Sequence, residues 1–397
     1  MEPQSTGHVQ KPGPADAGRR GGADRGGEKA QGGPRLRSLD ALRGFDMFWI
    51  AGGGALFVAL ANLTGWPVLV WWKTQLTHVE WHGFRFEDMI FPLFLFIAGI
   101  SFPFSMAKRG GDPEGRRALY RHIVQRGVAL VLLGLIAGNG IRFNFSELRY
   151  GSVLGHIGLA WMFAALIYMN ARVRTCLLWL AGILVGYWLL LRFSLAPDLG
   201  ATDPYSMEGS IVGYVDRLLL PGRLYKKIHD PEGLLSTVPA VATALLGMLT
   251  GHFVMRQPQG AKPERTVLKM AVAALGLLAA GWLWNFVFPI NKNLWTSSFV
   301  CFVGGLSLLL FLLFYMVIDV WKFEKWSLFF VVIGMNSITI YLAPKVIDFG
   351  KAAQFFFGSL IGLFPKEWSG VLNAAAYLAV AWAFLYFLYR KKIFLKV

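Results

Sequence analysis

Ten long apolar stretches constrain the fold of this chain more than any other feature. They lie at about residues 43–63, 87–106, 121–140, 152–170, 174–194, 235–256, 266–287, 297–320, 327–345 and 369–390. A membrane-spanning helix needs about 20 mostly apolar residues, and in lipid only helices and closed barrels satisfy every backbone hydrogen bond. The sequence therefore predicts an all-α fold, a polytopic transmembrane helix bundle of about ten spans.

The composition agrees with a protein whose surroundings are largely lipid. Of the 397 residues, 55% are hydrophobic and only 16% are charged, whereas soluble domains carry about 25% charged residues. A net charge of +16 would favour nucleic acid binding in a soluble chain. Here the basic residues lie mostly between the apolar runs, where they orient a membrane protein. We therefore expect membrane lipid, and no nucleic acid, as a partner.

Two segments fall outside the pattern of spans. Residues 352–364 (AAQFFFGSLIGLF) are apolar but too short to cross a bilayer, so they predict a short interfacial or re-entrant helix. Residues 1–34 are rich in Gly, Pro, Arg and Asp and contain no apolar run. Such a segment buries too little apolar surface to offset the entropy lost on ordering. It predicts a disordered cytoplasmic tail that precedes the membrane domain, residues 35–397.

The distribution of Lys and Arg predicts the orientation. With the N-terminus inside, 26 of the 39 basic residues fall on the cytoplasmic side, as the positive-inside rule requires. If residues 352–364 were a full span, the basic residues that follow the last apolar run would lie outside instead. Ten spans with both termini in the cytoplasm therefore fit the charges better.

The densest group of titratable side chains lies just before the second span, in THVEWHGFRFEDMIFP, residues 77–92. A histidine here, either His78 or His82, can act as a general base or accept an acyl group, and Glu87 or Asp88 can orient it. His78 and His82 are also four residues apart, but no third-ligand motif accompanies them, so we expect no metal. The alternative is a polar interfacial segment anchored by Trp81.

Two later segments place polar groups at or inside the membrane. NFVFPINKNLWTSS, residues 285–298, offers Asn291, Lys292, Asn293 and Trp295 at a span end. These groups either bind sugar hydroxyls and stack on a ring or merely cap helix ends. GMNSITIY, residues 334–341, puts Asn336 inside a span, where its amide either links helices or lines a polar cavity.

The segment RLRSLDALRGFDM leads directly into the first span. Its arginines Arg35, Arg37 and Arg43 either set the orientation by their charge or present a cationic surface to a phosphorylated cosubstrate. Asp46 lies a turn inside the apolar run, where an unpaired carboxylate is costly. That cost favours a functional role for the segment.

Six segments together resemble a known family. They are RLRSLDALRGFDM, HVEWHGFRFEDMIFPLFLFIAGIS, VLGHIGLAW, DPEGLLSTVPAVATALLGMLTG, PINKNLWTSSF and GMNSITIY, in this order. The set resembles the transmembrane acetyltransferases typified by lysosomal heparan-alpha-glucosaminide N-acetyltransferase, and especially their bacterial members. The likeness runs from about residue 35 to residue 390, and the combination of motifs is specific.

The resemblance implies a function and a place in the cell. Residues 35–397 would form a transmembrane acyltransferase domain in a bacterial inner membrane. Acetyl-CoA would be the cosubstrate, drawn from the cytoplasm, and an amino sugar or glycan on the external face would accept the acetyl group. The family's histidine lies in an H-A-S-W-N-G-like motif, which aligns His78 with the active-site residue and puts His82 in the position of the motif's Asn.

The predicted site follows from the residues and the resemblance together. The predicted catalytic residues are His78, His82 and Asp88. The predicted contacts to the coenzyme phosphates are Arg35, Arg37, Arg43 and Arg126. The predicted acceptor contacts are Trp81, Glu87, Asn291, Lys292, Asn293, Trp295 and Asn336. His78 would either carry the acetyl group covalently or deprotonate the acceptor amine.

Several alternatives stay open from the sequence. An O-acyltransferase of envelope polysaccharide would differ mainly in using a hydroxyl acceptor. A non-catalytic transporter would share the spans and buried polar residues, but no inverted repeat is visible. Some relatives carry an Asn late in the first span, where this chain has Ala51-Gly52-Gly53-Gly54, so the acceptor is left open. Gly304 and Gly305 allow close helix packing or a homodimer.

Overall fold

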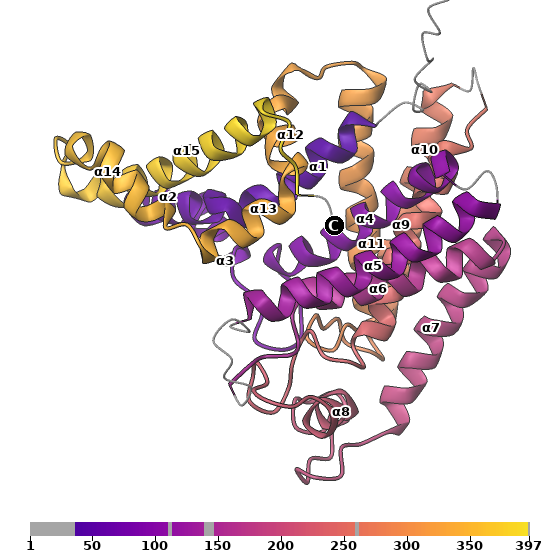
Figure 1. Cartoon of the computed structure of the whole chain (residues 1–397). Helices are drawn as coiled ribbons and strands as arrows, with labels where there is room; N and C mark the ends of the chain where they lie inside the picture. Colours follow the sequence, from indigo (N-terminus) through magenta and orange to yellow (C-terminus); the bar gives the residue numbers. More distant parts are fainter. Residues whose placement is uncertain (1–35, 110–112, 139–146, 259–261, 396–397) are drawn as a thin grey trace, which may run out of the picture. The chain divides into compact units, whose positions relative to one another are not determined.

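The computed structural model describes residues 36–109, 113–138, 147–258 and 262–395. The predicted tail, residues 1–34, lies outside these ranges. Within them the chain is helical, and its only β pairing is two isolated bridges, Arg149 to Gly222 and Leu195 to Ser210. The predicted all-α class is confirmed (Figure 1).

The helices follow one another along the chain, with longer connections before α4 and on either side of α8. They are α1 (Arg37–Phe48), a π-helical turn (Trp49–Gly53), α2 (Gly54–Thr64), α3 (Pro67–Gln75), α4 (Glu87–Arg109), α5 (Pro113–Ala137), α6 (Val153–Asn170), α7 (Val173–Phe193), α8 (Ile211–Leu219), α9 (Thr237–Met255), α10 (Pro263–Trp284), α11 (Ser297–Phe314), α12 (Leu328–Met335), α13 (Ser337–Leu342), α14 (Phe349–Ile361) and α15 (Ser369–Arg390).

The number of spans agrees with the sequence. Among the described residues, nine helices are long and apolar enough to cross a membrane. A tenth span results if the broken pair Lys325–Met335 and Ser337–Lys345, which bends by 61°, is counted as one. The short apolar stretch predicted at 352–364 forms α14, a helix of 13 residues. The chain is thus a multi-pass membrane protein with about ten spans.

Two predicted spans are interrupted rather than continuous. In the first, Gly52 has a φ of 121° inside the π-helical turn between α1 and α2, a conformation that favours glycine. The span predicted at 327–345 breaks at Asn336, whose backbone leaves the helical region between α12 and α13. The two breaks lie close to each other, because α13 contacts α1 and the π-helical turn. Residues at both breaks line the candidate site described below.

Two short helices lie in the segments between predicted spans. Helix α3 follows the first span, and Pro67 is its first residue, a position where proline's fixed φ suits a helix and its missing N–H costs nothing. Helix α8 lies between α7 and α9, and the Ser210 hydroxyl accepts a hydrogen bond from Val212 N at its start. These helices are too short for the periodicity of spans to reveal them.

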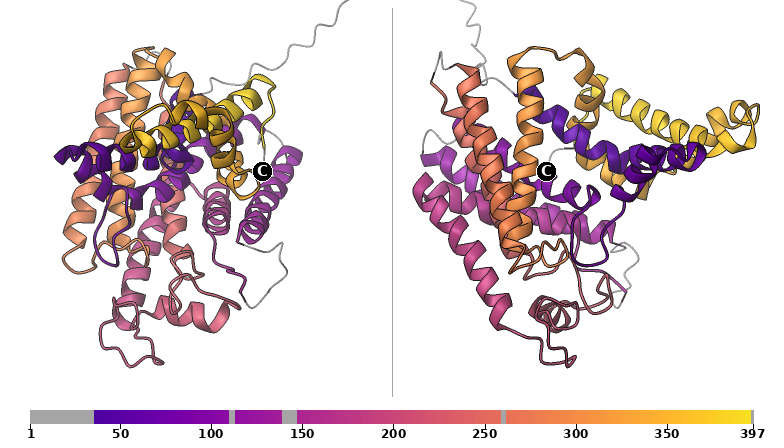
Figure 2. Two further views of the ribbon diagram at one scale, coloured as in Figure 1. Left: turned by 90° about the vertical axis from the view of Figure 1, so that its left-hand side faces the viewer. Right: turned by 180° about the vertical axis from the view of Figure 1, so that it is seen from behind.

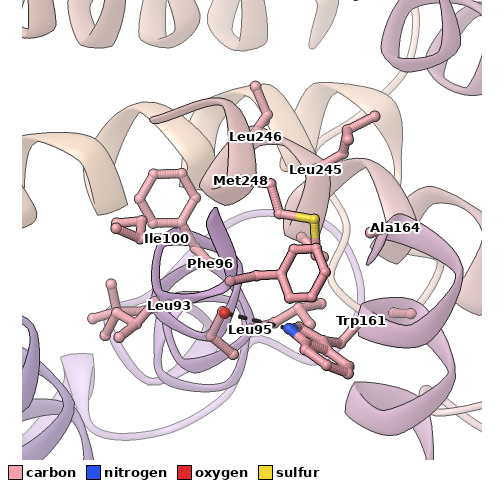
Figure 3. Close-up of a cluster of buried hydrophobic side chains, with 14 of the residues drawn as sticks. Leu93, Leu95, Phe96, Ile100, Trp161, Ala164, Leu245, Leu246 and Met248 are labelled. Carbon is pink, nitrogen blue, oxygen red and sulfur yellow. Dashed lines mark hydrogen bonds between the residues drawn. The ribbon is translucent and has the colours of Figure 1, made fainter. Parts of the chain in front are cut away.

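The core of the bundle is the contact of α4 with α6 and α9. Figure 3 shows Leu93, Leu95, Phe96 and Ile100 of α4 packed against side chains of α6 and α9. The indole N–H of Trp161 donates to Ala98 O over 3.3 Å in the same cluster. Helix α4 carries the first residues of the candidate site at its N-terminal end, so this core fixes their position.

Glycines allow α4 and α9 to approach closely. Gly247 and Gly251 form a G-x-x-x-G pattern on α9, and a Cβ atom at either position would overlap a backbone carbonyl of α4. Gly99 of α4 faces them, and a Cβ there would overlap Ala244 O. Small residues are what close helix packing in membranes requires, because no hydrophobic effect drives helices together in lipid.

Several connections between helices meet at one end of the bundle. In Figures 1 and 2 the α7–α9 segment with α8, the α10–α11 connection and the segment before α4 lie together at this end. These segments follow the first, fifth and seventh predicted spans. Because successive spans alternate in direction, the ten-span topology predicts all three segments on the same face of the membrane. We refer to this end as the site end.

Candidate active site

A cavity of about 350 Å³ lies where these segments meet. The polar residues that line it are Asp46 on α1, His78 in the loop before α4, Glu87 and Asp88 in the first turn of α4, Arg149 before α6, Tyr225, Lys226 and Glu232 between α8 and α9, Lys292 and Asn293 between α10 and α11, and Ser337 and Tyr341 on α13. Apolar side chains of α1, α4, α6 and α13 complete the wall. A mainly apolar cavity with a few converging polar groups is typical of a small-molecule site.

His78 and Asp88 form a hydrogen-bonded pair in this cavity. The Nδ1 atom of His78 lies 2.8 Å from Oδ1 of Asp88, whose side chain is buried while that of His78 is 52% exposed. An ionised carboxylate can only accept hydrogen bonds, so Nδ1 donates to Asp88, and Nε2 is left as an acceptor. Asp88 also accepts the backbone N–H of Arg85 over 3.0 Å. The imidazole is thereby held in one tautomer and orientation.

Lys292 reaches the same histidine from the α10–α11 connection. Its Nζ atom lies 3.3 Å from Nδ1 and 3.5 Å from Nε2 of His78, and 3.9 Å from Asp88 Oδ1. The Lys292 side chain is only 12% exposed, and this burial lowers the pKa of its ammonium. A partly desolvated ammonium beside an imidazole can stabilise negative charge that develops on a reacting oxygen.

Arg149 organises the opposite wall. It binds Asp230 through two hydrogen bonds, Nε to Oδ2 over 2.8 Å and Nη2 to Oδ1 over 2.6 Å, and it also pairs with Glu232. Its guanidinium stacks on the Tyr225 ring at 4.5 Å. Burial disfavours its charge, but the contacts to Asp230 and Glu232 outweigh that effect and raise the pKa of Arg149. The wall is therefore held by a partly buried ion-pair network.

A second row of side chains supports the cavity from behind. His82 Nδ1 accepts a hydrogen bond from Asn291 Nδ2 over 3.3 Å, and burial lowers the pKa of His82. The indole of Trp81 donates to Tyr205 O over 2.7 Å and packs edge-on against His229. His82, Trp81 and Asn291 do not line the cavity. They position the loops that do.

The structure brings only part of the predicted site together. The predicted residues that line the cavity are His78, Glu87, Asp88, Lys292 and Asn293. The tight turn between α10 and α11 sends residues that are close in sequence to different places. It directs Lys292 and Asn293 toward the cavity and buries Trp295 in the core. There the Trp295 indole donates to Thr243 Oγ1 over 3.1 Å, and its ring packs at a tilt of 34° against that of His156.

Asn336 also stays outside the cavity lining. It is buried at the break between α12 and α13, and its amide has no hydrogen-bond partner among the described residues. Its neighbour Ser337 lines the cavity instead. Because the chain turns at this break, adjacent residues point in different directions.

The predicted arginines lie away from the cavity. Arg37 pairs with Glu324 over 3.1 Å at the end of the bundle where α1 begins. Arg43 donates to Ser101 over 3.1 Å and pairs with Asp40. Arg126 stacks on Trp161 at 4.3 Å. Arg35 falls outside the described residues, so the structure does not place it.

Sequence reasoning missed much of one wall. Arg149, Tyr225, Lys226 and Glu232 come from connections far from the histidine motif along the chain. The Asp230-Pro231-Glu232 turn could have indicated a buried ion pair, because two carboxylates so close together need a cation. Arg149, which supplies that cation, is 81 residues away from Asp230, and local spacing does not connect them. No group of three metal-ligating side chains occurs in the described part of the chain.

Together, the fold and the cavity define a multi-pass helical membrane protein with a histidine–carboxylate site at one end of its bundle. Residues 35–281 match the family described as heparan-alpha-glucosaminide N-acetyltransferase, catalytic. This is more than half of the chain, and the chain belongs to that family. The resemblance seen in the sequence motifs is thus confirmed.

Two relatives extend the likeness beyond the matched region. Heparan-alpha-glucosaminide N-acetyltransferase of Homo sapiens is 26% identical over 431 residues, which cover 92% of this chain. The Mus musculus protein of the same name is 26% identical over 434 residues, which cover 91% of the chain. In each case the match spans 60% of the relative's own length. The likeness therefore includes the α10–α11 connection that supplies Lys292.

Proposed function

We propose that this protein is a transmembrane acetyltransferase that moves the acetyl group of acetyl-CoA to the amine of an amino sugar. The observation that carries the proposal is the His78–Asp88 pair in a 350 Å³ cavity, in a chain of the heparan-alpha-glucosaminide N-acetyltransferase family. A histidine oriented by a buried carboxylate is an arrangement suited to acyl transfer.

In the proposed reaction the acceptor amine attacks the thioester carbonyl directly. Nε2 of His78 removes a proton from the amine nitrogen, while Asp88 stabilises the imidazolium that forms. A C–N bond forms, the C–S bond breaks, and the coenzyme A thiolate leaves and takes up a proton from the imidazolium. The Lys292 ammonium, close to the His78 ring, stabilises the negative charge on the carbonyl oxygen of the tetrahedral intermediate.

The size of the cavity limits what enters it. A volume of about 350 Å³ is near the lower end of the roughly 300–1,000 Å³ of small-molecule sites. We therefore place one sugar unit and the acetyl end of the thioester inside it, and the nucleotide outside. Arg43 and Arg126 are our candidates for the phosphates, because the buried Nε of Arg126 has no hydrogen-bond partner among the described residues. Charge reversal at Arg43 is expected to weaken acetyl-CoA binding.

The proposed orientation puts the site end outside the cell. Both termini would then be cytoplasmic, the protein would lie in a bacterial inner membrane, and residues 35–397 would form the acyltransferase domain. The excess of Lys and Arg in connections at the opposite end supports this orientation. Acetyl-CoA would be drawn from the cytoplasm, and the acceptor would reach the cavity from the external face.

The test is transfer of labelled acetyl from acetyl-CoA to glucosamine by the purified protein in liposomes. Wild type is compared with His78→Ala and with His252→Ala as a matched control, because His252 bonds Tyr168 and does not line the cavity. We expect transfer to vanish only in His78→Ala. No transfer to an amine by wild type would overturn the proposal. An acetylated His78 formed from acetyl-CoA alone would replace direct attack by a two-step route.

A further inference from the structure

Two carboxyl groups in the cavity form no ion pair within the described part of the chain. Asp46 is 1% exposed, and neither of its side-chain oxygens has a hydrogen-bond partner among the described residues. Glu87 lies half-buried in the same lining, and no ion pair within 4 Å involves it in the described part of the chain. Glu87 stands in the first turn of α4, where an acidic side chain suits the helix dipole, but an uncompensated buried carboxylate is expensive, so a structural role does not explain Asp46.

The cations of the cavity are already engaged. Arg149 is bound to Asp230 and Glu232. Lys292 lies against His78 and Asp88. Lys226 donates to Glu80 O over 2.8 Å and lies over the Trp81 ring. These pairings leave Asp46 and Glu87, on the side formed by α1 and the start of α4, without an ion pair among the described residues.

The position of Asp46 makes it part of the cavity and not of the core. It lies on α1 one turn before Ile50, and both residues line the cavity. Glu87 precedes the Asp88 that holds His78. Asp46 and Glu87 therefore share one cavity with the imidazole.

We propose that Asp46, with Glu87, forms a subsite that binds the acceptor as a cationic ammonium and so selects amines over hydroxyls. This inference rests on the proposed transfer reaction. It specifies, in addition, that the site selects an acceptor that carries a positive charge. Charged hydrogen bonds to an ammonium satisfy both carboxylates, and a neutral hydroxyl does not. Before attack the bound ammonium passes one proton to the Glu87 carboxylate, which later releases it to solvent, and His78 takes the second proton as the C–N bond forms and returns it to the coenzyme A thiolate.

The test measures binding and needs no catalysis. Purified protein is titrated with glucosamine and, separately, with glucose, at a pH where the amine is protonated, and thermal stability reports occupancy. We expect wild type to bind glucosamine about tenfold to a hundredfold more tightly than glucose, since a hydrogen bond to a charged group contributes at this level.

Asp46→Asn keeps the shape of the side chain and removes its charge. We expect this variant to lose about tenfold or more of the preference for glucosamine, with its affinities for glucose and acetyl-CoA unchanged. Glu87→Gln, at a half-buried position, is expected to act in the same direction. Asp348→Asn is the control, because Asp348 caps α14 outside the cavity and its loss should leave the preference intact.

The outcomes separate this inference from the proposed function. A glucosamine preference that persists in Asp46→Asn, or is absent from wild type, overturns the subsite even if acetyl transfer occurs. A preference that depends on Asp46 supports the subsite even if no acetyl transfer is found, in which case the proposed reaction alone fails. An Asp46→Asn variant that is folded and at least as heat-stable as wild type supports a binding role, whereas unfolding of both carboxyl variants overturns it.

Discussion

Asp88 accepts hydrogen bonds from His78 on one oxygen, Nδ1 to Oδ1 over 2.8 Å, and from the backbone N–H of Arg85 on the other, over 3.0 Å. The carboxylate is buried in the first turn of α4. It therefore ties the loop that carries the histidine to the helix at the centre of the bundle core. The orientation of the His78 imidazole and the conformation of the loop before α4 therefore both depend on the Asp88 side chain.

Replacement of Asp88 by Asn is expected to lower acetyl transfer roughly a hundredfold to ten-thousandfold, because an amide no longer fixes the tautomer that leaves Nε2 free. The turnover number should fall, while acetyl-CoA binding stays close to that of wild type. Steady-state kinetics and an equilibrium binding assay measure the two effects. Equal losses of binding and turnover would mean that Asp88 acts only through folding of the loop.

Replacement of Lys292 by Met tests the stabilisation of the tetrahedral intermediate. Loss of one donor at a developing oxyanion costs roughly a hundredfold to a thousandfold in rate, so we expect a loss of that size in turnover. Lys351→Met is the matched control, because Lys351 is an exposed residue of α14 that pairs with Asp348. Full activity of Lys292→Met would remove Lys292 from the mechanism.

The Arg149 network is expected to contribute to stability as well as to the shape of the cavity. In Arg149→Met the buried Asp230 loses its cation, and breaking a buried pair in this way costs roughly 3–5 kcal/mol. The double variant Arg149→Met, Asp230→Asn should recover part of that loss, because the unpaired charge is removed. Thermal unfolding in detergent compares the three proteins. A double variant no more stable than the single one would contradict this account.

The contact between α4 and α9 should tolerate no methyl group at Gly247. A Cβ atom there would overlap Phe96 O, so Gly247→Ala must push the helices apart, at a cost of roughly 1–3 kcal/mol. The same change at Gly182 of α7 is the control, because, apart from its chain neighbours and the backbone of its own helix, no described heavy atom lies within 4 Å of its Cβ position. Thermal unfolding of the two alanine variants is the measurement, and equal melting temperatures would exclude close packing at Gly247.

The stability of the site end should depend on the protonation of His229. Burial lowers the pKa of His229 to about 4, from 6.5 in an exposed histidine. Between these values the unfolded chain binds a proton that the folded protein does not, so stability falls as the pH drops from 6.5 to 4. The contribution is about 3 kcal/mol. Below pH 4 both states are protonated and the loss stops growing.

The comparison must be made between variants, since Asp216 acts in the opposite direction. Burial raises the pKa of Asp216 to about 7, which favours the folded state at low pH over the same range. His229→Gln can still donate to Asn293 O, the partner of His229 Nε2 at 2.9 Å, but does not titrate. We therefore expect it to lose less stability than wild type on acidification. Parallel melting curves across this pH range would contradict the prediction.

The histidine motif illustrates what could be predicted from local sequence. His78, Glu87 and Asp88 lie within one short segment before a span, so their proximity follows from chain connectivity, and all three line the cavity. The sequence predicts Trp295 at a span end and Asn336 inside a span, both as acceptor contacts, yet both are buried away from the cavity. Which side of a turn a residue faces depends on the packing of the neighbouring helices, and sequence spacing alone does not contain that information.

The sequence by itself determined the all-α fold, about ten spans and the family, because backbone hydrogen bonding in lipid forces long apolar runs into helices. Only the tertiary structure decided which charges meet. It pairs Arg149 with Asp230 across 81 residues and places Asp46 of the first span in the same cavity as His78. The energy of a charge depends on its nearest neighbours and its burial, and both are set by how the helices pack.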